Sequence, residues 1–256
     1  METKVDEVFM KKKLIKKLED YGYNQIKKPR EKLIKFTDNQ KWNKYLSDIE
    51  DHSHLFVLAC LGDKRIKAKR AWEIPMKIGE SIGGFDFDRY SNLSANQLKS
   101  LFRKNSLHHF TDKVAFEYYE GINKIKVEYG GVAKRIWEDS MQSSSIVRKF
   151  LEFNGIGPKI AGMAVNILLR QFNLDIKDLQ WIDISPDVHV VRVFKRAKLV
   201  RPEASNDEVV WKARELHSKY PGVLDIACYR YGKDYCKKRT PNCSECPLSN
   251  ECLKFI

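Results

Sequence analysis

The sequence lacks a long apolar segment. Its longest uninterrupted apolar run, Leu55 to Leu61, is far too short to cross a bilayer. The first residues, Met1 to Lys13, are charged, whereas a secretory leader needs an apolar stretch. We therefore expect an intracellular protein without a membrane partner, nucleoid-associated in a prokaryotic cytoplasm or nuclear in a eukaryote.

Internal repeats and low-complexity linkers are also absent, so domain boundaries are poorly marked in the sequence. Apolar residues recur at helical spacing, and two capping boxes, Ser94-x-x-Gln97 and Ser205-x-x-Glu208, predict helix starts. Val188 to Phe194 fits a strand and a helix equally well. The chain is otherwise predicted to be all-α.

Acidic residues are outnumbered, with 34 Asp and Glu against 47 Lys and Arg, which gives a formal charge of +13. This balance suits a polyanionic partner such as nucleic acid. A lysine-rich solvated surface explains it equally well, so charge alone does not identify a function. The 43% hydrophobic content is ample for a packed core.

The most informative segment is Ser145 to Arg170, in which two helix-like stretches flank Asn154-Gly155-Ile156-Gly157. The glycines allow a tight turn, and Pro158 suits the first position of the second helix. Backbone amides at such a turn can hold a phosphate of any DNA sequence. The same turn can also simply join two helices. Lys159 follows in the first helical turn, where the helix dipole disfavours the ammonium form, and partial burial would add to this effect.

GIGPKIA resembles the hairpin of the endonuclease III branch of the helix-hairpin-helix DNA glycosylases. In that branch a catalytic lysine occupies the position of Lys159, and related monofunctional enzymes have other residues there. The resemblance therefore implies a bifunctional glycosylase that also cleaves abasic DNA through a Schiff base.

Asp187 begins a second motif, Asp-Val-His-Val-Val-Arg-Val, similar to the family's D-x-H-x-x-R-V. The resemblance implies a catalytic carboxylate, which can accept a proton or stabilise positive charge on the sugar. Asp187 also suits a helix cap, and the two roles are compatible. Twenty-seven residues lie between Lys159 and Asp187, more than is usual in the family, so Phe172 to Ile184 is expected to contain a loop or extra turn. Asp183 is the alternative acid.

The stretch after Leu55 lacks the glutamine with which endonuclease III relatives fill the gap left by a flipped nucleotide. Leu61, Lys64 or Arg65 is the candidate replacement, since an extruded base leaves a space in the stack. A solvated basic turn explains these residues equally well.

Six cysteines are unevenly spaced, and four of them, Cys236, Cys243, Cys246 and Cys252, lie within seventeen residues. Clustered cysteines in an intracellular protein favour a metal site over disulfides, and four thiolates suit either zinc or iron-sulfur. The spacing resembles the iron-sulfur loop of the family, which implies a [4Fe-4S] cluster. Cys60 and Cys228 are expected in the core.

The resemblance implies two all-α domains, a six-helix barrel domain and an iron-sulfur cluster domain, with DNA binding across the cleft between them. We expect an N-terminal helical extension over residues 1–50 packing on the cluster domain, a six-helix domain over 51–175 with the helix-hairpin-helix at 145–170, and a cluster domain over 176–256. The expected DNA contacts are Asn154, Gly155, Ile156, Gly157, Lys64, Arg65, Lys237, Lys238 and Arg239.

The expected function is base-excision repair by a monomer on double-stranded DNA that carries a lesion or a modified base. Oxidised pyrimidines are the first expectation for the substrate, ahead of mismatched or modified bases. The alternatives are a monofunctional glycosylase, a non-catalytic structure-specific DNA-binding protein, and a zinc-stabilised basic nucleic-acid module.

Overall fold

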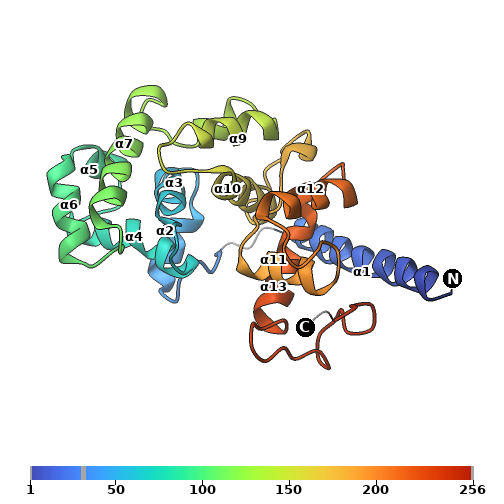
Figure 1. Cartoon of the computed structure of the whole chain (residues 1–256). Helices are drawn as coiled ribbons and strands as arrows, with labels where there is room; N and C mark the ends of the chain where they lie inside the picture. Colours follow the sequence, from blue (N-terminus) through green and yellow to red (C-terminus); the bar gives the residue numbers. More distant parts are fainter. Residues whose placement is uncertain (1, 30–32, 255–256) are drawn as a thin grey trace. The chain divides into compact units, whose positions relative to one another are not determined.

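The computed structural model describes residues 2–29 and 33–254, and within these ranges the chain forms α-helices and 3₁₀ turns without a β-strand (Figure 1). The all-α prediction is confirmed, and Val188–Phe194 is helical. The helices are α1 (Glu2–Lys27), α2 (Gln40–Ser47), α3 (Ser53–Gly62), α4 (Ala68–Ser81), α5 (Phe87–Ser91), α6 (Ala95–Lys104), α7 (Thr111–Glu128), α8 (Arg135–Glu138), α9 (Ser143–Leu151), α10 (Pro158–Arg170), α11 (Val188–Arg196), α12 (Asn206–Leu216) and α13 (Asp225–Asp234), with 3₁₀ turns η1 (Leu179–Trp181) and η2 (Pro221–Leu224).

The chain divides into two compact units. The central unit is Arg30–Ala164, and the terminal unit combines Met1–Pro29 with Val165–Ile256. The boundary expected at residue 50 falls inside the central unit, because the ring centres of Phe36 and Trp72 of α4 lie 4.2 Å apart and α2 packs on α3. The boundary expected at residue 175 falls inside the terminal unit, which already includes the second half of α10.

The central unit is built around α3, whose residues are all buried. A helix that is apolar on every side must be covered on every side, and α3 packs against α2, α4 and α7. His54 is buried within it and donates from Nε2 to the carbonyl of Phe85 at 2.9 Å. Burial lowers the pKa of His54 to about 4, so the ring is neutral at physiological pH.

The terminal unit joins both ends of the chain. The helix α11 packs against α12 and α13, while α1 packs against α13 and η2. Leu14 and Leu18 of α1 are fully buried. Lys17 donates to the carbonyl of Pro247 at 3.1 Å and pairs with Glu251 at 2.7 Å, which fixes α1 to the C-terminal loop.

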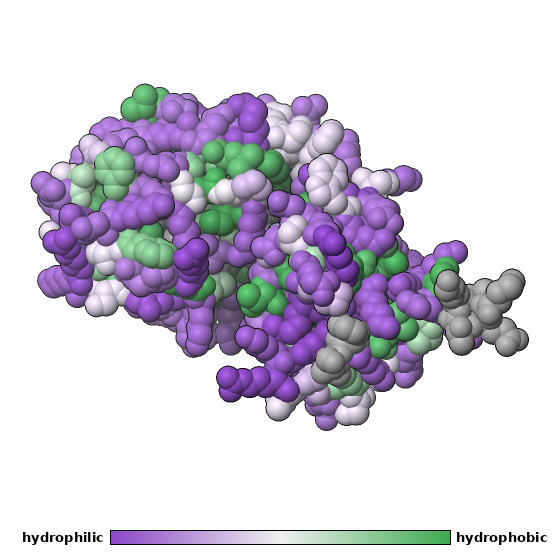
Figure 2. Space-filling model, viewed as in Figure 1, coloured by the Kyte–Doolittle hydropathy of each residue, from purple (hydrophilic) through white to green (hydrophobic). Residues whose placement is uncertain are grey.

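Both predicted capping boxes are present. Ser94 and Gln97 bond reciprocally at the start of α6, and Ser205 and Glu208 do so at the start of α12. Among the described residues no helix combines the length and the apolar character that a membrane span requires. The face drawn in Figure 2 is mostly hydrophilic, in keeping with a chain in which 32% of residues are charged.

Candidate functional site

The predicted hairpin is present between α9 and α10, in the central unit. Ile156 is 5% exposed and its amide donates to the carbonyl of Phe153 at 3.0 Å, so this side chain anchors the turn in the core. Gly155 has φ +95°, a left-handed conformation that an L side chain rarely adopts. Pro158 is the first residue of α10, as its fixed φ favours.

The two glycines of the hairpin differ in what surrounds them. A Cβ atom at Gly155 would lie 2.0 Å from Lys64 Nζ and 2.7 Å from Glu117 Cδ, so the protein itself requires glycine there. A Cβ atom at Gly157 would meet no atom within 4 Å. Steric crowding within the chain therefore does not account for Gly157, whose backbone is open to approach from outside.

Lys159 is the second residue of α10 and is exposed. Its neighbours Ile160 and Ala161 are buried, so the helix turns its apolar side inward and Lys159 outward. The partial burial considered for Lys159 from the sequence is not present. Lys159 follows Gly157, the glycine whose Cβ position is unoccupied by other atoms, by two residues in the sequence.

Asp187, in the terminal unit, is the N-cap of α11. Its Oδ1 accepts from the amides of His189 and Val190, each at 2.8 Å, which satisfies two amide donors of the first helical turn. The capping role considered from the sequence is therefore confirmed. Both cap bonds use Oδ1, so Oδ2 is not part of the cap.

Asp183, the alternative acid, is held in an ion pair. Arg214 donates from Nε to Oδ1 at 2.7 Å and from Nη2 to Oδ2 at 2.6 Å, and this pairing raises the pKa of Arg214. The carbonyl of Asp183 accepts from Asn166 at 2.9 Å. With both carboxylate oxygens engaged, Asp183 has a structural role and Asp187 is the better candidate.

The extra residues between Lys159 and Asp187 form the expected loop with one turn, η1. Gly222 donates to the carbonyl of Ile182 at 2.7 Å and so fixes the loop to η2. Trp181 is 54% exposed at the end of η1, which is unusual for so large an apolar side chain.

The three wedge candidates lie in very different environments. Leu61 is fully buried in α3, where its side chain fills the space above Gly121, so the suggestion that it enters DNA is wrong. Lys64 is mostly buried and pairs with Glu117. Arg65 is exposed, with φ +55°, and its guanidinium lies over the Phe110 ring at 6.0 Å. Of the three, Arg65 alone is available at the surface.

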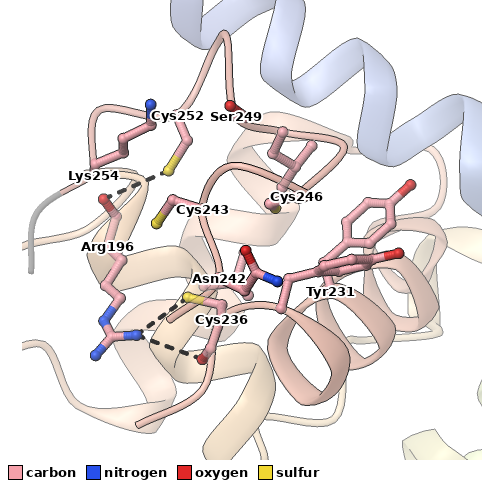
Figure 3. A pocket seen from close by; sticks show the side chains of 12 residues that line it. Arg196, Tyr231, Cys236, Asn242, Cys243, Cys246, Ser249, Cys252 and Lys254 are labelled. Atoms are coloured by element: carbon pink, nitrogen blue, oxygen red, sulfur yellow. Dashed lines mark hydrogen bonds between the residues drawn. The ribbon is translucent and has the colours of Figure 1, made fainter. Parts of the chain in front are cut away.

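The four clustered cysteines line one cavity of the terminal unit (Figure 3). It encloses about 400 Å³ of empty space, including its open mouth, and no carboxylate lines it. The charged side chains in its lining are Arg196 and Lys254, both cationic, which suits a group of thiolates. Burial raises the pKa of the Cys246 and Cys252 thiols. Cys60 and Cys228 are buried in the core, as predicted.

Two arginines of α11 hold the start of the cysteine loop. Arg192 donates to the carbonyl of Cys236 and, at 2.7 Å, to that of Gly232. Arg196 donates to the carbonyls of Lys237 and Lys238 at 2.7 and 2.8 Å, and its Nη1 lies 3.5 Å from Cys236 Sγ. The predicted contacts Lys237, Lys238 and Arg239 are exposed. Because their segment is held through its backbone, these side chains extend to solvent.

The sequence did not indicate several residues that shape these sites. Arg192 is part of the Asp187 motif, but the motif does not indicate that Arg192 donates to the carbonyl of Cys236, 44 residues away. Glu117 carries no sequence signal, because a single glutamate in a helix has no motif. Asn154, predicted as a DNA contact, donates to Glu120 Oε2 of α7 at 2.7 Å.

Comparison with known proteins agrees with the fold. Two solved endonuclease III structures, a trapped covalent DNA intermediate and a non-covalent DNA complex, superpose with TM-scores of 0.56 and 0.57 at 19% and 18% identity. Each covers 83% of this chain and 91% of its own. The predicted endonuclease III-like fold is therefore confirmed.

Sequence comparison gives a shorter match. The chain is 29% identical to the adenine DNA glycosylase of Schizosaccharomyces pombe over 106 residues, which are 40% of this chain and 21% of that protein. The match thus spans about a fifth of the length of that relative. The chain matches no protein-family profile.

Proposed function

We propose that this chain is a DNA glycosylase of base-excision repair that also cleaves abasic DNA through Lys159. The observation that carries the proposal is the exposed lysine at the second position of α10, two residues after the open hairpin glycine Gly157. The endonuclease III fold and the local likeness to an adenine DNA glycosylase support the same activity.

The hairpin docks on the DNA backbone. The first turn of an α-helix has amides without an acceptor inside the helix, and the positive end of the helix dipole favours an anion there. Gly157 allows a phosphate to approach the main chain without a side chain in between. This contact involves no base, so it positions the enzyme on any sequence.

Lys159 supplies the nucleophile and Asp187 the acid–base group. The Lys159 amine, once deprotonated, forms a bond from Nζ to the sugar C1′ while the glycosidic C1′–N bond breaks and the departing base takes a proton. Ring opening gives the Schiff base. Loss of a C2′ proton then breaks the C3′–O bond, and water hydrolyses the imine to restore the lysine.

Borohydride trapping tests this chemistry. The protein is incubated with a duplex that contains one abasic site in the presence of sodium borohydride, which reduces a Schiff base to a stable amine. We expect a covalent adduct that Lys159→Ala removes and that Lys104→Ala, a change to another exposed lysine of the central unit, leaves intact. An adduct that survives in Lys159→Ala contradicts the assignment.

A second candidate is a glycosylase that releases the base without cleaving the strand. The local match to an adenine DNA glycosylase favours it. Strands that break only after alkali treatment, with no trapped adduct, identify this activity. A non-catalytic DNA-binding protein would instead show affinity without turnover on abasic or damaged DNA.

The cysteine cavity holds a [4Fe-4S] cluster in this proposal, with Cys236, Cys243, Cys246 and Cys252 as ligands. The four thiols share one cavity, yet no three His, Cys, Asp or Glu side chains among the described residues come close enough together to hold a single metal ion. Four thiolates would suit either one zinc ion or a [4Fe-4S] cluster, and the likeness of the Cys236, Cys243, Cys246 and Cys252 spacing to the family's iron-sulfur loop favours the cluster. When bound, it supplies a structural cross-link of the loop. Visible absorbance with iron and sulfide analysis separates the two metals.

The substrate is double-stranded DNA with a damaged, mismatched or modified base. The protein acts as a monomer, in the nucleoid of a prokaryote or in the nucleus of a eukaryote. Arg65 is the proposed wedge, since it is exposed and its guanidinium lies 6.0 Å from the centre of the Phe110 ring. The basic run Lys237, Lys238 and Arg239 provides further phosphate contacts.

A further inference from the structure

A partly buried ion pair lies directly beneath the hairpin. Glu117 of α7 is 2% exposed, and its carboxylate bonds to Lys64 Nζ, whose side chain is 17% exposed. The distances from an added Cβ at Gly155, 2.0 Å to Lys64 Nζ and 2.8 Å to Glu117 Oε1, place both charges against the main chain of the turn. The hairpin therefore rests on an ion pair.

A neighbouring segment fixes the backbone of Lys64. The carbonyl of Lys64 accepts from His108 Nε2 at 3.0 Å, while His108 Nδ1 accepts from the amide of Phe110 at 3.0 Å. With Nδ1 accepting a backbone proton, His108 is neutral and carries its proton on Nε2. The turn between α6 and α7 thus holds the backbone of Lys64 in place.

A second carboxylate of α7 completes the support. Glu120 lies three residues after Glu117, on the same side of the helix, and accepts from Asn154 Nδ2 at 2.7 Å. The first residue of the hairpin is therefore bonded to α7, and the second lies against the ion pair. Burial lowers the pKa of Lys64, which reflects the unfavourable transfer of its charge from water.

Such a pair contributes little to stability compared with apolar side chains of the same size. It does restrain the segments that carry the two charges, because either charge would be left half-buried and unpaired if they separated. We propose that Lys64 and Glu117 are positioning residues that hold the hairpin backbone in the conformation that presents its amides to a DNA phosphate. This role replaces the direct DNA contact predicted for Lys64, and it rests on the proposed function.

Glu117→Gln separates this role from simple electrostatics. Removing a negative charge beneath a phosphate site would tighten DNA binding if only charge mattered. A positioning role requires the opposite, because glutamine can still accept a hydrogen bond from Lys64 but no longer balances its charge. Binding should then weaken by roughly 10–100-fold. The double variant Lys64→Met/Glu117→Leu leaves no charge of the pair behind, and we expect it to bind DNA more weakly as well. It replaces Glu117→Gln in the test if that variant does not fold.

The probe is a fluorescent duplex with one tetrahydrofuran abasic-site analogue, titrated at several salt concentrations. We expect weaker binding with an unchanged salt slope in both variants, and faster hydrogen exchange at the amides of 155–157 but not within α3. Lys134→Met and Glu50→Gln, which make the same charge changes at a more exposed pair of the central unit, are expected to bind like the wild type.

Three results would overturn the proposal. The first is unchanged or tighter binding by Glu117→Gln. The second is a salt slope reduced by about one in Lys64→Met/Glu117→Leu, which marks a direct phosphate contact. The third is exchange of the hairpin amides in the wild type as fast as in an exposed turn. Gly157→Val is the reference for hairpin docking. If the wild type fails to bind, or Gly157→Val binds equally well, the proposed function itself has failed; if only Glu117→Gln binds normally, this inference alone has failed.

Discussion

Asp187 has an observed role as a helix cap and a proposed role in the chemistry, and substitution can distinguish them. Its Oδ1 caps α11 through the amides of His189 and Val190, and the proposed chemistry needs its carboxylate charge. Asparagine is as good an N-cap as aspartate, because its side-chain oxygen accepts the same bonds. Asp187→Asn should therefore keep the helix start while removing the charge.

Asp187→Ala removes both the helix cap and the carboxylate charge. Loss of an N-cap costs about 1 kcal/mol, within a range of roughly 0.5–2 kcal/mol, which corresponds to a drop of roughly 2–4 °C in the melting temperature of a chain this long. We expect Asp187→Asn to melt within about 1 °C of the wild type, and Asp187→Ala to show the full drop. Base release should fall by roughly 10²–10⁴-fold in both variants.

The assay pairs thermal unfolding by circular dichroism with single-turnover base release, both on cluster-loaded protein. If Asp187→Asn released the base at the wild-type rate while Asp187→Ala did not, Asp187 would be only a cap. If the asparagine variant melted as early as the alanine variant, the capping argument would be refuted instead.

Three further predictions follow from buried or paired groups. The pKa of His54 falls from 6.5 in the unfolded chain to about 4, so the stability that its neutral form provides is complete above pH 6.5 and is lost as pH falls toward 4. The loss approaches about 3 kcal/mol, and chemical denaturation of His54→Phe should lack this pH dependence. Asp183→Asn should lower the unfolding free energy by roughly 1 kcal/mol, since its pair with Arg214 is partly exposed, yet leave base release unchanged; a large loss of turnover would restore Asp183 as the acid. Arg196→Ala should speed tryptic cleavage after Lys237, Lys238 and Arg239, because their backbone loses its donors; an unchanged digestion rate would contradict that role.

Local sequence rules predicted the features that depend on a few consecutive residues. The capping boxes at Ser94 and Ser205, the hairpin turn and the cap at Asp187 all have a pattern of four to seven residues, and all are present. The helical state of Val188–Phe194 was ambiguous because its four valines favour strands. The cap at Asp187 and the burial of Val190, Val193 and Phe194 decide it.

Features that depend on distant residues were beyond prediction. Lys64 is one of many lysines in the sequence, and nothing near it indicates that Glu117, 53 residues away, is its partner. The central unit begins at Arg30 and not at the expected residue 51 for the same reason, since its extent depends on the packing of Phe36 against Trp72. Arg192 could be recognised as part of a motif, but its contact with Cys236 bridges 44 residues.

The terminal unit is made of two segments far apart in the chain, and this affects how the protein emerges from the ribosome. Leu14 and Leu18 are buried in the finished unit, but α1 packs against α13 and η2, and Lys17 pairs with Glu251. The central unit is continuous in sequence and can fold as soon as it has been synthesised. During translation at about 5–20 residues per second, the apolar side of α1 therefore stays uncovered for roughly 10–50 s before η2 and α13 have been synthesised. A chaperone that binds amphipathic helices would therefore bind the nascent chain at α1.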